Sequence, residues 1–451
     1  MPFRLLSLWF AALMAAPVAA AAQSAPQPPS SLWNQDTLTG NWGGLRTTLQ
    51  NDGISLGLQE QSEVWDNLEG GQRQGVTYDG LTTASLRIDL DKLAGWNGAT
   101  FFVDFFQIHG HGPSGTMVGN LQFVSNIEAT DSNKLYDLWL EQSLGRLNVR
   151  IGQEGASDEF MIADDAALFI NSSFGYAALP NTDLPDGGPN YPLATPFVRV
   201  RYKATDAITL LTGVYNGDPA PAGPGDPQLR DHNGTAFRLN DHVLLFWEAW
   251  YSRNKGDNTP GLPGTYKLGV WYDSARFPDV LYDNTGRSLA SPASDRMALA
   301  HDGDYAVYGI ADQTVWRRPG DSGESLAAFL QVMGAPDDRN ICNLFIEAGV
   351  NWKAPFGRGN DAAGIALSYE GIGGAARRYS EELAAFTGSG KTYATNETVI
   401  EATYNYQVAP WLALQPDAQY VVNPGAFIPT SFAPRPLNNA LVVGIRATVT
   451  F

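Results

Sequence analysis

The amino-acid sequence predicts an all-β fold: a transmembrane antiparallel β-barrel of about sixteen strands, with external loops folded inward. Three observations predict it. The closing segment, residues 441–451, alternates apolar and polar side chains along its length, which is typical of a strand with lipid on one side and water on the other. Similar alternating runs recur along the chain, and the connections between them alternate between long and short.

The composition supports strands rather than helices. The chain of 451 residues contains 47 Gly and 28 Pro together with 12 Trp, 18 Tyr and 21 Phe, and it shows little helical periodicity. Many short strands without helices indicate a barrel, a sandwich or a propeller. The single cysteine, Cys342, excludes an intrachain disulfide. The net charge of −18 argues against nucleic acid as a partner.

The first 36 residues are expected to lie outside the barrel. Residues 1–22 begin with Arg4, continue through an apolar run and end in small residues, which predicts a secretory signal peptide. The alternative, a membrane anchor, is weaker because the apolar run is short and is broken by Pro17. Residues 23–36 are rich in proline and are expected to form a flexible periplasmic segment. The barrel itself is assigned to residues 37–451.

An even number of strands places both chain ends in the periplasm, as bacterial barrels require. The predicted strands are residues 54–65, 82–90, 99–109, 134–144, 146–153, 196–203, 207–216, 241–252, 264–273, 304–316, 325–334, 341–353, 362–370, 397–407, 412–422 and 437–451.

The connections between these strands give an independent test. A soluble sandwich has no reason to alternate long and short connections, whereas an outer-membrane barrel has long external loops and short periplasmic turns. We therefore favour the membrane barrel. The expected external loops are residues 66–81, 110–133, 154–195, 217–240, 274–303, 335–340, 371–396 and 423–436.

A barrel of this size leaves an aqueous channel, so something folded inward must set its diameter. The longest connection, residues 154–195, is the best candidate for a constriction, because long loops of this kind are usually functional. Residues 110–133 are a second candidate. The acidic side chains that the longest loop would bring inside are Asp158, Glu159, Asp164 and Asp165.

Strand alternation also indicates which side chains face the lumen. Arginine forks and carboxylates bond paired hydroxyl groups, and aromatic faces cover the C–H faces of a sugar ring, while each contact must stay weak enough for the solute to leave. The alternative is that these charges only tie strands and loops together. The candidate pore-lining residues are Arg87, Asp89, Trp139, Glu141, Arg150, Arg199, Arg201, Lys203 and Trp271.

Nothing in the sequence indicates catalysis. His109 and His111 form a weak metal pattern without further ligands. We find no nucleophile elbow and no phosphate-binding loop. We therefore expect no enzyme activity, no cofactor and no bound metal.

With these residues considered, the chain from Leu38 to Phe451 resembles the carbohydrate-selective porins of the OprB family. Seven short motifs in order along the chain carry the resemblance. They are LTGNWGGLRTTLQNDGISL, LYDLWLEQ, VRIGQEGASDEF, LPGTYKLGVWYD, DYAVYGIADQ, FLQVMGAPDDRN and WLALQPDAQYVVNPG.

The resemblance implies an outer-membrane porin that admits sugars passively, narrowed by inward loops bearing arginines, acidic residues and aromatics. Gln107 and His109 in the third strand stand where we expect a basic residue near the pore in sugar-selective members, and Gln331 in the eleventh strand stands where the family often has arginine. A general-diffusion porin for small polar or charged solutes is therefore the alternative. The expected partners are sugars, outer-membrane lipid, the barrel-insertion machinery that recognises Phe451, and two further copies in a homotrimer.

Overall fold

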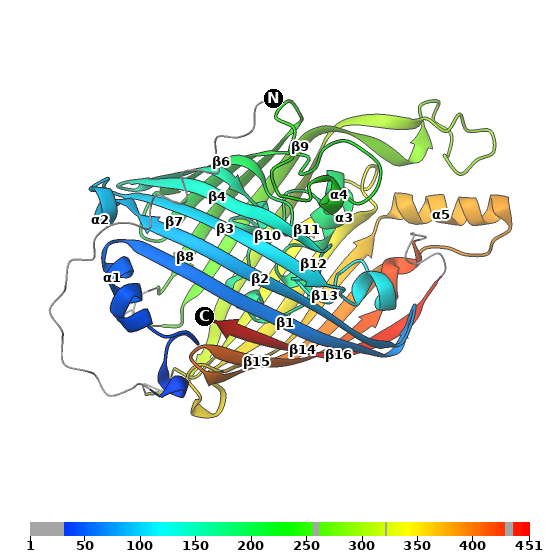
Figure 1. Cartoon of the computed structure of the whole chain (residues 1–451). Coiled ribbons are helices and arrows are strands. Elements are labelled where there is room, and N and C mark those ends of the chain that lie inside the picture. Colours follow the sequence, from blue (N-terminus) through cyan, green and yellow to red (C-terminus); the bar gives the residue numbers. More distant parts are fainter. Residues whose placement is uncertain (1–30, 256–260, 321–322, 429–435) are drawn as a thin grey trace, which may run out of the picture.

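In the computed structural model, sixteen strands form one closed antiparallel barrel in which each strand pairs with its neighbours in sequence and β1 pairs with β16 (Figure 1). The structure describes residues 31–255, 261–320, 323–428 and 436–451. The signal peptide predicted at residues 1–22 lies outside these ranges. The strands are β1 (Ile54–Gly71), β2 (Gly75–Asp89), β3 (Ala99–Gly110), β4 (Ser132–Leu144), β5 (Leu147–Glu154), β6 (Thr195–Lys203), β7 (Ile208–Asn216), β8 (Val243–Arg253), β9 (Gly264–Asp283), β10 (Ala298–Arg317), β11 (Ser325–Gly334), β12 (Cys342–Lys353), β13 (Ala362–Ile372), β14 (Asn396–Ala409), β15 (Leu412–Val422) and β16 (Asn438–Thr450).

Short helices occupy the two ends of the barrel. In Figure 1 two of them, α1 and α2, lie at the end with the short turns, and α5 projects from the opposite end. Within the described ranges no helix is both long and apolar enough to cross a bilayer. The helices are α1 (Leu45–Asn51), α2 (Leu90–Ala94), α3 (Ala178–Asp183), α4 (Pro227–Arg230) and α5 (Gly374–Thr387).

The closing strand confirms the predicted alternation. Ile445 faces outward and is 43% exposed, whereas Arg446 is buried on the lumen side and pairs with Glu63 of β1. The chain ends in the seam of the barrel, because the amide of Phe451 donates to the carbonyl of Leu58 across a distance of 2.9 Å. Strand β16 therefore presents lipid-facing and water-facing sides, as the membrane barrel requires.

All sixteen predicted strands are present, but two predicted loops are wrong. Residues 66–81 form a hairpin, since β1 runs to Gly71 and β2 begins at Gly75. Residues 274–303 are also largely paired, because β9 continues to Asp283 and β10 begins at Ala298. Beyond the bilayer both faces of a hairpin contact water, so its side chains no longer alternate between apolar and polar. The backbone pairing continues there without this sequence signal.

The described part of the N-terminal segment contacts the periplasmic end of the barrel. Leu32–Asn34 form a single 3-10 turn. The indole nitrogen of Trp411 donates to the carbonyl of Leu32 at 2.9 Å, and the Trp33 and Trp411 rings stack with centroids 5.9 Å apart. Aromatic pairs of this kind are common at a membrane–water interface.

The main apolar core lies inside the barrel, where the inward loops meet the wall. Phe160, Phe169 and Leu179 of the connection between β5 and β6 are buried against inward side chains of the wall such as Phe246 and Trp271. The prediction of inward-folded external loops is therefore confirmed. The packed loop narrows a lumen that sixteen strands would otherwise leave wide.

Cross-strand glycines make room for large inward side chains of the wall. Gly444 of β16 is paired with Trp65 of β1, and a Cβ atom at Gly444 would lie 2.2 Å from the indole ring. The pair of Gly269 and Tyr308 has the same geometry. Each aromatic ring thus lies over a glycine of the neighbouring strand, which packs the wall densely at both places.

We expect Gly444→Val to destabilise the barrel by about 1–3 kcal/mol, because the added methyl groups overlap the buried Trp65 ring. Urea unfolding of the folded protein in liposomes, followed by the mobility shift of folded against unfolded barrel on gels, measures this change. Gly309→Ala is the control, because its new Cβ has only one neighbour within 4 Å, the carbonyl of Lys267 at 3.9 Å. Equal unfolding midpoints for the two variants would contradict the packing argument.

Candidate functional site

Buried carboxylates on the barrel wall hold the long connection between β5 and β6, residues 155–194, which we call the constriction loop. Each carboxylate accepts hydrogen bonds from backbone amides of the loop, and such charge-assisted bonds are among the stronger ones in proteins. The pairs are Glu248 with the amide of Met161 (2.8 Å), Asp312 with that of Asp165 (3.1 Å), and Glu401 with those of Ile170 and Asn171 (2.6 and 2.9 Å).

The connection between β3 and β4, residues 111–131, is held in the same way. Glu397 of β14 accepts from the amides of Leu121 and Gln122 at 2.9 and 2.8 Å. The side-chain amide of Asn171 then donates to the carbonyl of Gln122 at 3.1 Å. The two inward loops are therefore bonded both to the wall and to one another.

Three arginines on neighbouring strands face the constriction loop at one carboxylate. Arg150 of β5 and Arg199 and Arg201 of β6 face the lumen, since all three side chains reach one residue of the inward loop. Glu159 of the loop contacts them at 2.7 Å, 3.0 Å and 2.7 Å, respectively. The expectation that acidic loop residues lie across from the inward arginines is confirmed for Glu159.

Two wall carboxylates complete this charge network. Glu141 contacts Arg150 at 2.8 Å and Arg199 at 2.9 Å, and Glu154 contacts Arg150 at 3.0 Å. The Arg199 side chain is wholly buried, whereas 36% of the Arg201 side chain stays exposed. Arg199 therefore belongs to the packed support of the loop, and Arg201 presents a guanidinium to the lumen.

Two tryptophans support the arginines. The Arg150 guanidinium lies 4.0 Å from the ring centre of Trp139, which also stacks on Phe102. The Arg201 guanidinium lies 5.5 Å from the ring centre of Trp250. These cation–π contacts orient the guanidinium planes without neutralising their charge.

The remaining predicted pore residues occupy different places. Arg87 is exposed, lies 5.8 Å from the Trp139 ring and has no ion-pair partner within the described part of the chain. Asp89 caps helix α2 by accepting from the amides of Asp91 and Lys92. Lys203 is exposed near a short turn, 3.5 Å from Asp206. Trp271 is wholly buried and packs in the core between wall and loop.

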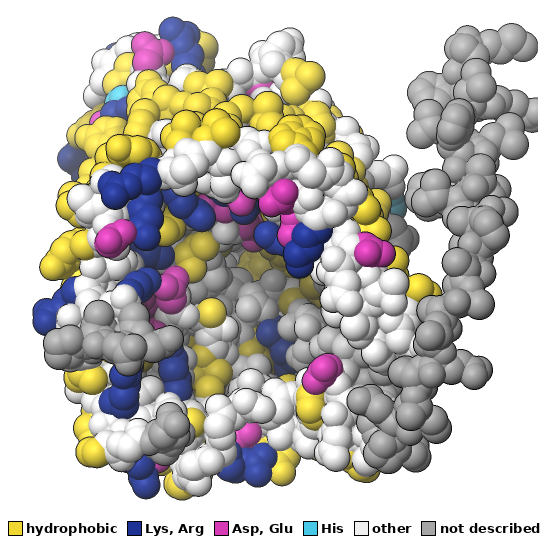
Figure 2. Space-filling view, turned by 90° about the vertical axis from the view of Figure 1, so that its left-hand side faces the viewer, with side chains coloured by type: hydrophobic (Ala, Val, Ile, Leu, Met, Phe, Trp, Pro, Cys, Tyr) yellow, Lys and Arg dark blue, Asp and Glu magenta, His cyan; other side chains and the backbone are white. Residues whose placement is uncertain are grey.

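The open lumen is visible from the end that carries α1 and α2. Figure 2 shows a hollow in this face, with Lys, Arg, Asp and Glu side chains along its wall. Mixed charges of this kind favour polar solutes and give the lumen no single dominant sign.

Two residues expected near the pore lie on the outer face of the barrel instead. Gln107 and His109 point away from the lumen, because Phe102, Asp104 and Phe106 take the inward positions of β3. The expectation that Gln107 and His109 stand near the pore is therefore wrong. Gln331 of β11 does face inward and is buried opposite Glu347.

Sequence reasoning missed the side chains that hold the loops. Glu248 and Trp250 share the inward face of β8, and the predicted strand over residues 241–252 already contained both of them. Asp312 and Glu397 were also within or at the edge of predicted strands. Their alternation indicated a lumen position, but only the folded loop supplies the amides that they bind.

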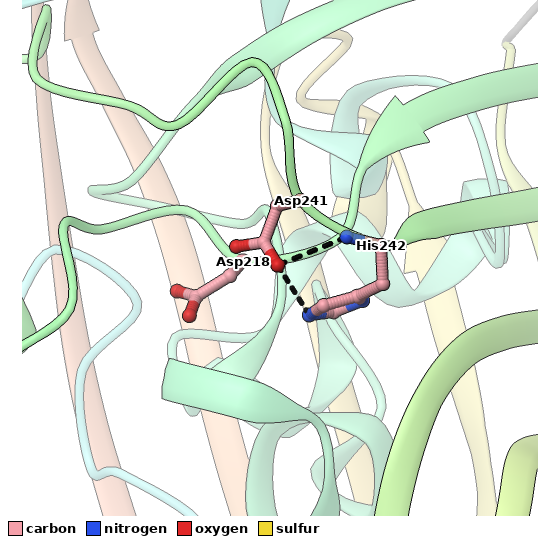
Figure 3. A group of neighbouring side chains, drawn as sticks. All are labelled: Asp218, Asp241 and His242. Carbon is pink, nitrogen blue, oxygen red and sulfur yellow. Dashed lines mark hydrogen bonds and ion pairs between the residues drawn. The ribbon is translucent and has the colours of Figure 1, made fainter.

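Asp218, Asp241 and His242 form an acidic cluster in the external connection before β8 (Figure 3), and each offers one ligand atom within 4.8 Å of the others. Arg238 already contacts both aspartates. Burial by itself would lower the pKa of His242, but the surrounding carboxylates outweigh it and raise that pKa. Because Arg238 compensates the two carboxylates, the cluster is an ion-pair network that holds the connection between β7 and β8 together.

A closed sixteen-stranded barrel with long external loops folded into a polar lumen defines a porin of the bacterial outer membrane. Residues 73–451 match the family described as "Carbohydrate-selective porin, OprB family". The chain belongs to this family, whose members are channels and not enzymes.

Individual relatives agree with this assignment. The chain is 25% identical to Porin B of Pseudomonas aeruginosa over 444 residues, covering 94% of this chain and 92% of the relative. A high-pH structure of OprB from Pseudomonas putida has the same fold, with a TM-score of 0.82 at 23% identity, covering 94% of this chain and all of that one.

We expect Glu159→Gln to loosen the constriction loop and to make the channel more anion-selective, because three arginines lose a shared negative charge. Removing one partner of a buried ion pair costs about 3–5 kcal/mol. Reversal potentials in a salt gradient across planar bilayers measure the selectivity. Asp164→Asn is the comparison on the same loop and should shift the selectivity less, because Asp164 meets one cation, Lys267, at 3.6 Å and 59% of its side chain is exposed. Wild-type ion selectivity in Glu159→Gln would contradict the role of Glu159 as the shared counter-charge of the three arginines.

Proposed function

We propose that sugars cross this porin by passive diffusion through the gap between the constriction loop and the wall formed by β2 to β6. Arg201 and Arg87 are the groups that touch the solute. The observation that carries the proposal is the geometry of Arg201, which is fixed by Glu159 at 2.7 Å and yet remains partly exposed.

The chemistry of this gap suits neutral polyhydroxylated solutes. A guanidinium presents several donors in a fixed plane, which match the oxygens of neighbouring hydroxyl groups. Because Glu159, Glu141 and Glu154 compensate the arginines beside them, the net field on a passing ion is small. Weak, partly compensated contacts allow the solute to enter and to leave.

The other candidate residues receive supporting roles in this proposal. Arg150, Arg199 and Glu141 hold the loop at its position, and Trp139 orients Arg150. Lys203 and Asp89 lie at the periplasmic end of their strands, where they affect entry into the periplasm more than selection. Trp271 contributes packing between wall and loop.

Replacing Arg201 with alanine should weaken sugar binding by about ten- to a hundredfold, since a hydrogen bond to a charged group is worth about 1.5–3 kcal/mol. Liposome swelling with a panel of sugars, together with sugar block of single-channel current, measures the change. Arg87→Ala should act in the same direction. Lys203→Ala is the matched control and should bind sugars as tightly as the wild type. Arg199→Ala should instead alter channel conductance, because this side chain supports the loop.

The alternative is a general-diffusion porin for small polar or charged solutes. The same liposomes separate the two functions when amino acids of matched size are compared with sugars. If sugars permeate no faster than these amino acids, the sugar-selective proposal is wrong and general diffusion replaces it.

Two proposals concern the protein partners of this chain. We propose that the chain assembles as a homotrimer and that the barrel-insertion machinery recognises its C-terminal strand. The position of Phe451 in the closing seam supports the second point, since its amide bonds to Leu58 and its carbonyl accepts from Arg46 at 2.9 Å.

Phe451→Ala should lower the amount of folded barrel in the outer membrane, because the terminal aromatic is the feature we propose to be recognised. Heat-modifiability gels of membrane fractions give the folded amount. The purified variant refolded into detergent is the control and should fold as wild type. Normal membrane levels would rule out recognition through this side chain.

A further inference from the structure

A cavity of about 490 Å³ lies inside the barrel, between the two inward loops and the wall. Its lining comes from both loops, from helix α4 in the connection between β7 and β8, and from inward side chains of β1, β3, β4 and β16. A volume of this size is typical of sites for small molecules. We call this space the outer cavity.

Strand direction separates the outer cavity from the arginines of the constriction. Strand β3 runs toward the external end, so Phe106 in the cavity lining lies four residues, about 13 Å along the strand, beyond Phe102. Phe102 stacks on Trp139, and the Arg150 guanidinium lies over the same indole ring. Strand β4 runs the opposite way, and Tyr136 of the cavity precedes Trp139 by three residues. The outer cavity is therefore a separate place, nearer the external end of the lumen.

The outer cavity is open to water. Asp158, Ala167 and Gly175 of the constriction loop line it, and all three residues are exposed. The cavity is thus part of the aqueous lumen and differs from a sealed packing defect, so a dissolved molecule is able to enter it.

Three aromatic rings form one side of the outer cavity. Phe106 and Tyr136 stack with centroids 4.6 Å apart, and the ring of Tyr191 from the constriction loop lies 5.6 and 6.3 Å from them, respectively. The Tyr191 hydroxyl donates to the carbonyl of Ile127 at 2.7 Å, which fixes the ring in place. Phe106 and Tyr136 are buried, whereas Tyr191 is partly exposed. Tyr191 is therefore the ring of this group that a solute contacts most readily.

Hydrogen-bonding side chains complete the lining. The Asn126 oxygen accepts from the Arg446 guanidinium at 2.6 Å, and Arg446 in turn pairs with Glu63. This contact orients the Asn126 amide, whose NH2 group donates to no other group in the described part of the chain. Gln61 of β1 also lines the cavity, and its side chain makes no hydrogen bond to any residue that the structure describes. Both amides therefore keep donors for a solute, and the Asp158 carboxylate supplies an acceptor.

We infer that the outer cavity is a second saccharide site, which selects for a closed sugar ring before the solute reaches Arg201. The inference rests on the sugar diffusion proposed above and adds a recognition step to it. The Tyr191 ring covers the C–H face of a pyranose, while the amides of Asn126 and Gln61 donate to its hydroxyl groups and Asp158 accepts from them.

The two sites read different features of the solute. A guanidinium such as that of Arg201 bonds hydroxyl groups of a closed ring and of an open chain alike. An acyclic polyol has the same hydroxyl groups but no rigid apolar face, so it gains only the polar contacts of the outer cavity. Preference for the ring therefore arises at Tyr191.

The test compares glucose with sorbitol, its acyclic reduction product, as blockers of single-channel current in planar bilayers. Wild type is expected to bind glucose about two- to tenfold more tightly than sorbitol, the range of an aromatic contact. Tyr191→Leu should bring this ratio close to one. Tyr191→Phe is the matched control, because it loses the bond to Ile127 but keeps the ring, and it should retain the ratio. An unchanged ratio in Tyr191→Leu would overturn the inference.

A second pair of variants tests the polar side of the outer cavity without altering its aromatic group. Gln61→Ala should weaken the binding of both glucose and sorbitol by about two- to tenfold, the range of one hydrogen bond between neutral groups. Gln59→Ala is the control, since Gln59 shares the inward face of β1 two positions nearer the periplasm and does not line the cavity. Equal binding constants in the two variants would count against the site.

Failure of this inference is distinguishable from failure of the porin proposal. Arg201→Ala should weaken glucose and sorbitol binding by the same factor and leave their ratio unchanged. If sugars enter liposomes faster than amino acids of matched size while wild type binds glucose and sorbitol equally, only the outer-cavity site is wrong. If sugars enter no faster than those amino acids, the sugar-selective function is wrong.

Discussion

The hydrogen bonds from loop amides to buried wall carboxylates are the interaction on which the rest of this structure depends. Where a loop packs against the inside of the wall, its backbone N–H groups are buried away from water, and each unpaired donor there costs free energy. Glu248, Asp312 and Glu401 supply acceptors at three separate strands. The loop is thereby fixed around the inside of the barrel, and the position of every polar group on it follows.

One consequence is that three arginines with the same chemistry have different roles. Glu159 contacts Arg150, Arg199 and Arg201, but the three arginines differ in burial. The Arg199 side chain is wholly buried, whereas the Arg201 side chain still faces the lumen. A buried arginine with two carboxylate partners is a support, whereas an exposed one retains donors for a solute. Compensation by neighbouring glutamates keeps the local field modest despite the density of charge.

Strand parity explains both the successes and the main error in the prediction of this lumen. Alternation correctly placed Trp139, Glu141 and Arg446 inside the barrel. The same alternation places His109 on the outer face, because Phe102, Asp104 and Phe106 take the inward positions of the strand. The expectation of a pore residue at position 109 did not take this alternation into account. Because the side-chain period of a strand is two residues, such a position is either wholly inside or wholly outside. The polar groups on the outer face are therefore a property of the β1–β3 surface and not of the channel.

The sequence by itself determined the barrel and the number of strands, because these depend on period-two alternation and connection lengths that are local in the chain. For the narrowing of the lumen it offered two candidate loops, residues 154–195 and 110–133, without choosing between them. It did not predict the extended external hairpins, since alternation ends where both faces are wet. Only the tertiary structure decided which charges are supports and which are open to solute. That distinction arises from contacts between residues far apart in sequence, such as Glu401 with Ile170 and Glu159 with Arg201, and from the burial that those contacts create.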